Sequence, residues 1–249
     1  MRRLTIGFTI TAFVLMAAVP AAAGYVVYSN DFEGTGPLGP EWSAGVTTDI
    51  TPGTVAHPAD KFLGQFGNQT VTLTLDNLYP DHTEVTLSYD LYIIRSWDGN
   101  FDQDARGPDY LANAEGIVPQ GPGDWQWITT FSNWGPTGPR QAFPGEVPTG
   151  DYQARTGASE NDTLGFLFDD GNGPFVQDAV YRFVDVPIPH TGDTLILSIG
   201  ADHLQALDDE SWGIDNMKVE IDAIPEPSTL ALLLIAGLTL LCSLRRRAK

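Results

Sequence analysis

The feature that most constrains the fold of this sequence is a strict alternation of apolar and polar residues in several separate segments. Such alternation places every apolar side chain of a strand on one face of a sheet. The clearest segments are 71–75, 85–93 and 195–199, where Val, Leu, Tyr or Ile occupies every second position. Further strands are predicted at 25–32, 125–131, 164–168, 180–186 and 212–221.

Turn-forming residues separate these segments, as in Asp98-Gly99-Asn100 and in 169–173. Gly, Asn and Asp are typical of tight turns. Between the two ends of the chain, no segment shows a sustained helical period. Short strands joined by polar turns predict an all-β fold, a single two-sheet antiparallel β-sandwich or jelly roll. We place this one domain at residues 24–222.

The N-terminal segment, residues 1–23, has the layout of a secretory signal. Arg2 and Arg3 precede an apolar run over 4–19, and Pro20 is followed by three alanines. A positive start, an apolar centre and small residues before a cleavage site are typical of a signal peptide. We therefore predict an N-terminal signal helix, cleaved after Ala23 by signal peptidase, and export by the general secretion machinery. The alternative is a retained anchor helix.

The C-terminal segment, residues 223–249, has three parts. Pro225, Glu226 and Pro227 precede an uncharged stretch over 228–244, which is followed by the basic residues of 245–249. A helix over 228–244 is about 25 Å long, slightly shorter than the ~30 Å hydrocarbon core of a bilayer. The long side chains of the arginines that follow can reach the membrane surface and so compensate for the difference. We predict a transmembrane helix whose basic end stays cytoplasmic, which places residues 24–223 outside the inner membrane.

This tail resembles the PEP-CTERM sorting signal of Gram-negative bacteria, with the Pro-Glu-Pro triplet, the short membrane helix and the basic end in the same order. The resemblance implies that an exosortase cleaves near Pro225, Glu226 and Pro227, and that the protein passes from the inner membrane to the cell surface or the extracellular matrix. It also implies an association with exopolysaccharide and biofilm. The alternative is an ordinary linker before an ordinary anchor helix.

The charge of the chain limits its partners. Asp and Glu number 32 against 13 Lys and Arg, a formal net charge of −19. An acidic surface repels phosphate, so nucleic-acid binding is excluded. The one cysteine, Cys242, lies in the C-terminal tail. No disulfide therefore braces the exported domain, and its stability must come from the core or from bound ions.

Two acidic segments form a pair near the ends of the domain: Asp31-Phe32-Glu33 and Ile214-Asp215-Asn216. The first and last strands of an antiparallel sandwich often lie side by side, and carboxylates are calcium ligands. The segments resemble the first and last strands of concanavalin A-like sandwiches of the MAM and laminin-G type. That resemblance implies a structural Ca²⁺ held by Glu33 and Asp215, with help from Asp31.

A second acidic segment, 98–104, alternates oxygen-bearing side chains. Its glycine is misplaced for an EF-hand loop, and the twelfth position holds Asp109 in place of Glu. The segment is therefore either a solvated turn or a calcium loop, and we keep Asp98 as a candidate ligand.

The long segment 132–161 contains four prolines and almost no alternation. Its aromatic residues, including Trp134 and Tyr152, either stack on a sugar ring or fix the loop to the sandwich. Trp125 and Trp127 are further candidates for stacking on a glycan.

No recognised catalytic motif is present. Glu220 and Glu226 resemble the two glutamates of the laminarinase-type signature, but their spacing is one residue too long, and about 20 Å separates them in an extended chain. We therefore expect a non-catalytic protein of the surface or extracellular matrix, possessing a glycan-associated or purely structural role. The alternative is a carbohydrate-active hydrolase with an unrecognised carboxylate pair near Trp125, Trp127 or Trp134.

Overall fold

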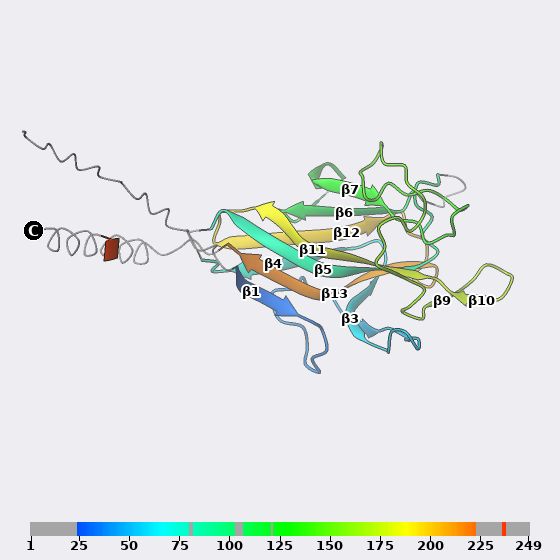
Figure 1. The fold of residues 1–249 in the computed structure, drawn as a ribbon, viewed down its shortest axis with the longest axis horizontal. Coiled ribbons are helices and arrows are strands. Elements are labelled where there is room, and N and C mark those ends of the chain that lie inside the picture. Colours follow the sequence, from blue (N-terminus) through cyan, green and yellow to red (C-terminus); the bar gives the residue numbers. More distant parts are fainter. Residues whose placement is uncertain (1–23, 80–81, 103–106, 121, 223–235, 238–249) are drawn as a thin grey trace, which may run out of the picture.

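A computed structural model describes residues 24–79, 82–102, 107–120, 122–222 and 236–237. Within residues 24–222 the described chain is all-β, and two antiparallel sheets pack as a sandwich (Figure 1). The predicted all-β sandwich is therefore confirmed. The predicted signal helix lies outside the described residues, as does the predicted transmembrane helix except for positions 236 and 237. Among the described residues, no helix has the length and hydrophobicity needed to cross a bilayer.

The larger sheet has seven strands in the order β2-β3-β13-β5-β11-β8, with β1 also paired to β13. Its two central strands, β5 and β13, each contain twelve residues and run along the length of the molecule (Figure 1). The strand bounds are β1 Tyr25–Asn30, β2 Thr48–Ile50, β3 Lys61–Phe66, β5 Glu84–Arg95, β8 Glu160–Asn161, β11 Asp178–Pro189 and β13 Glu210–Ile221.

The smaller sheet has four strands in the order β4-β12-β6-β7. Their bounds are β4 Thr70–Asp76, β6 Tyr110–Glu115, β7 Trp127–Thr130 and β12 Thr194–Asp202. The alternating residues of β4 and β12 face the larger sheet and are buried in the core, as the sequence predicts. The residues between them face outward.

The first and last strands of the sandwich lie side by side, as expected. β1 pairs antiparallel with β13, from Tyr25 opposite Ile221 to Asn30 opposite Met217. One end of the sandwich, at the right of Figure 1, carries the long segment 132–161 and the hairpin of β9 (Leu167–Asp169) and β10 (Pro174–Val176). A short 3₁₀ turn, η1 (Pro122–Asp124), precedes β7.

Candidate functional site: an aromatic cleft on the four-stranded sheet

The outer face of the four-stranded sheet contains a cleft of about 640 Å³. All four strands contribute outward-facing residues to its floor, and the segment between β6 and β7 forms one wall. We call it the Trp125 cleft and define it by these residues: Thr70, Tyr110, Gln120, Trp125, Ile128, Gly200, Asp202 and His203.

Trp125 lies directly over the backbone of β12. A Cβ atom added at Gly200 would come within 2.8 Å of the Trp125 ring and 2.9 Å of the Thr70 hydroxyl. Such distances are shorter than a van der Waals contact, so only glycine allows the indole to approach the strand this closely. The indole is half-buried and forms an apolar surface above the sheet.

A second pair of rings lies in the same cleft. The rings of Tyr110 and His203 are 5.2 Å apart between centroids and tilted by 59°. Burial, with a smaller effect of Asp102 and Asp202, raises the pKa of the Tyr110 phenol, which keeps it protonated and able to donate a hydrogen bond. The distance between His203 Nε2 and Asp202 Oδ2 is 3.8 Å.

The cleft thus combines aromatic surface with separate polar groups. Ring faces pack against the C–H face of a sugar, while hydroxyl, amide and carboxylate groups bind its hydroxyls. Among the described residues that line the cleft, Asp202 is the one carboxylate. Glycoside hydrolysis ordinarily uses two carboxyl groups that flank the scissile bond. The described residues of the cleft supply one of these two groups.

The other aromatic residues selected from the sequence lie elsewhere. Trp127 faces the core and packs edge-on against Phe143, with ring centroids 6.3 Å apart. The Trp134 indole N–H donates to the Ser96 carbonyl at 3.1 Å and to the Asp98 carboxylate at 2.7 Å. These two tryptophans therefore fix chain segments to the sandwich. Tyr152 is 40% exposed and pairs through its backbone with Gln141.

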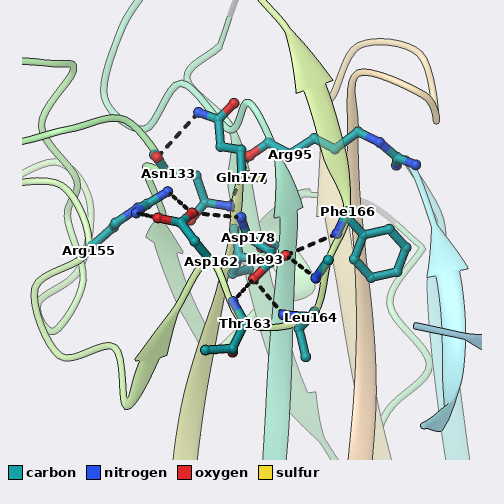
Figure 2. Close-up of polar contacts among 11 residues, drawn as sticks. Ile93, Arg95, Asn133, Arg155, Asp162, Thr163, Leu164, Phe166, Gln177 and Asp178 are labelled. Atoms are coloured by element: carbon teal, nitrogen blue, oxygen red, sulfur yellow. Dashed lines mark hydrogen bonds and ion pairs between the residues drawn. The ribbon is translucent and has the colours of Figure 1, made fainter. Parts of the chain in front are cut away.

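A polar network, drawn in Figure 2, holds the long segment 132–161 and the residues that directly follow it. Asp178 is fully buried and accepts four backbone N–H bonds of 2.9–3.1 Å from residues 163–166. Arg155 forms two bonds with Asp162, of 2.7 and 2.8 Å. Asn133 donates to the carbonyls of Ile93 and Arg95. The network fixes the loop, so its conformation is built into the fold.

The first set of predicted calcium ligands is not assembled around one point. Asp215 accepts from the Tyr92 hydroxyl at 2.8 Å and from the Asn216 N–H at 2.7 Å. Glu33 accepts from the Lys61 N–H at 2.8 Å, and Asp31 accepts from the Glu33 N–H at 3.2 Å.

The acids around Glu33 and Asp215 nevertheless influence each other. The pKa of Glu33 is lowered mainly by a hydrogen bond with Asp60 and, to a smaller extent, by the hydrogen bond from the Lys61 N–H. Burial raises the pKa of Asp60. Burial also raises the pKa of Asp215 to about 6. Asp215 lies opposite Asp90 on the neighbouring strand, and Arg182 pairs with Asp90 at 2.8 Å. Both aspartates are buried.

Asp98 lies beside two carboxylates that the sequence did not single out as a group. The Asp98 N–H donates to Asp109 Oδ2, and the Glu210 carboxyl interacts with Asp109. Burial is the main cause that raises the pKa of Asp109 to about 9, and the neighbouring carboxyl groups contribute less. Burial also raises the pKa of Glu210 to about 7. Asp109 Oδ1 is buried and accepts no hydrogen bond from the described donors. Asp109 and Glu210 therefore hold their protons to a higher pH than exposed carboxyl groups do.

Across the described part of the chain, no group of three or more His, Cys, Asp or Glu side chains has an arrangement that could hold a metal ion. The implied calcium ion therefore has no complete ligand set among these residues, and it stays a prediction. The predicted sorting motif, Pro225, Glu226 and Pro227, lies outside the described residues.

In comparisons with models of known families and with curated proteins, the chain matches none.

Proposed function

We propose that this protein is exported, processed by an exosortase, and binds polysaccharide at the cell surface or in the extracellular matrix without cleaving it. The observation that carries the proposal is the Trp125 cleft, in which an indole, a phenol and an imidazole lie beside the polar groups of Thr70, Gln120 and Asp202. An apolar ring face beside a few polar groups is the usual composition of a carbohydrate subsite.

The two ends of the sequence support the location. An N-terminal signal and the Pro-Glu-Pro tail would carry the sandwich out of the cytosol. The acidic charge of the chain favours a neutral or cationic glycan over a polyanionic one, since like charges repel. The sandwich would then serve as a rigid support that holds the cleft toward the matrix.

A glycan array probed with the full-length chain tests this proposal. We expect binding to a restricted set of neutral or cationic oligosaccharides, and loss of that binding in Trp125→Ala. Because Trp125 is only half-buried, the variant should keep its fold, which a melting curve verifies. An absence of binding to any glycan, or full binding by Trp125→Ala, would contradict the proposal.

A further inference from the structure

The core between the two sheets is not completely filled. A cavity of about 480 Å³ lies between them, bordered by β5, β11 and β13 on one side and by β4, β6, β7 and β12 on the other. Protein interiors are normally packed with few voids larger than a water molecule. A void of this size is within the range of small-molecule sites. We call it the intersheet cavity.

The cavity reaches solvent at one edge of the sandwich. Trp127 on β7 and Phe183 and Ile188 on β11 belong to the edge of the core and are only half-buried. Val186, also on β11, lines the cavity and is half-buried too. An apolar ligand can therefore enter between β11 and the β6–β7 pair without separating the sheets.

One polar group inside the cavity has no partner. Tyr89 on β5 lines the cavity, is 5% exposed and stacks on Phe183, with ring centroids 4.7 Å apart and planes 12° apart. Its hydroxyl forms no hydrogen bond with any residue that the structure describes, and burial raises its pKa. A hydroxyl that borders the cavity without a protein partner is free to hydrogen-bond water or a ligand there.

The outer end of the cavity is polar and acidic. Asn113 and Glu115 occupy inward-facing positions on β6, alternating with the outward-facing Ala112 and Ala114, and line the cavity together with Gln126. Glu115 lies 3.8 Å from His190 between Oε1 and Nε2. A carboxylate here disfavours an anionic ligand, since the two negative charges would repel in a partly buried site.

We propose that the intersheet cavity binds a neutral amphiphile: an aliphatic chain with a hydroxyl group that hydrogen-bonds within the cavity. The aliphatic chain of the ligand would contact Leu87, Phe183 and Met217. The ligand hydroxyl would accept a hydrogen bond from the Tyr89 hydroxyl or form hydrogen bonds with the side-chain amides of Asn113 and Gln126 at the mouth. This site is separate from the Trp125 cleft, which lies on the outer face of the four-stranded sheet.

Methionine methyl NMR on the full-length chain provides the test, with 1-decanol as the probe. The sequence has three methionines, Met1, Met16 and Met217; of these, Met217 lies in the described part of the chain, where it lines the cavity. Met217→Leu identifies its signal. We expect decanol to shift the Met217 signal saturably, and decanoate, an anion of the same chain length, to bind about tenfold more weakly.

Variants locate the site. Val186→Trp fills the mouth and should remove the decanol-induced shift, whereas Val184→Trp, on a side chain that is 61% exposed, should leave it unchanged. Tyr89→Phe should weaken decanol binding by about threefold to tenfold. The proposal fails if decanol causes no saturable shift of Met217, if Val186→Trp binds decanol as wild type does, or if decanoate binds as tightly as decanol. If a variant does not fold, the titration of the wild-type protein with decanol still tests whether the cavity binds the alcohol.

Discussion

The indole of Trp125 rests on the backbone of Gly200, at a distance that leaves no room for a side chain on β12. Gly200 lies in the middle of a paired segment, opposite Thr70 on β4 and Ala112 on β6. A glycine inside a strand weakens the strand, so its place here is explained by the ring that lies on it. This contact sets the orientation of the aromatic surface in the Trp125 cleft.

Gly200→Val should therefore displace the ring. We expect glycan affinity to fall about tenfold and stability to fall by about 1–3 kcal/mol, the usual cost of overpacking. Titration calorimetry and thermal melting measure the two effects. Gly135→Ala is the control, because a Cβ atom there would have no neighbour within 4 Å. Unchanged glycan binding in Gly200→Val would contradict the assigned role of the contact.

Much of the fold could be predicted from the sequence, because alternation directly reports a strand with one buried face. β5 and β12 follow this pattern and were predicted correctly. β6 was missed because Asn113 and Glu115 occupy its inward positions, so the strand lacks alternating hydrophobicity. β3 was missed because Phe62 is buried on the outer face while Leu63 is buried in the core, which gives no alternation.

The candidate site was only partly predictable. Trp125 was selected as an aromatic candidate, but Tyr110 and His203 were not, since they come from strands and turns far apart in the sequence. The available signal was Gly200, an isolated glycine in an otherwise strongly alternating segment, which indicates a close approach to the backbone. Trp127 and Trp134 resembled Trp125 in the sequence, and only their packing separates them from it.

The raised pKa values of Asp109 and Glu210 should make stability depend on pH. Both acids have a raised pKa in the folded state, about 9 and about 7, so between about pH 5 and 9 the folded protein holds protons that the unfolded chain has released. Stability should therefore be greatest at low pH and decline as pH rises through these values. Asp109→Asn should flatten this decline by up to about 1.4 kcal/mol per pH unit. Chemical denaturation across this pH range measures it, and an equal slope in both proteins would contradict the raised pKa of Asp109.

The calcium prediction includes Asp98, which lies beside Asp109, and it can be tested through the effect of pH on calcium binding. A cation compensates ionised carboxylates, so calcium should raise the melting temperature more at about pH 9 than at about pH 5. At a calcium concentration 100 times the Kd, the gain is about 2.7 kcal/mol. Melting of the full-length protein in calcium and in chelator provides the measurement. Identical curves in both would rule out a structural calcium ion.

The sorting motif makes a prediction that is independent of the cleft. Two prolines that flank one carboxylate favour an extended, accessible backbone, which a protease requires. Glu226→Ala should leave the uncleaved chain in the membrane fraction, whereas Glu220→Ala, upstream of the motif, should be processed normally. Immunoblotting of membrane and extracellular fractions shows which form accumulates. Normal processing of Glu226→Ala would contradict recognition by an exosortase.

The most direct test of the central claim is a calorimetric titration of the full-length chain with a purified neutral exopolysaccharide. The account predicts saturable binding that weakens by about tenfold or more in Trp125→Ala and stays unchanged in Tyr152→Ala, whose exposed ring lies outside the cleft. Absence of binding by the wild type, or loss of binding in Tyr152→Ala with Trp125→Ala unaffected, would contradict it.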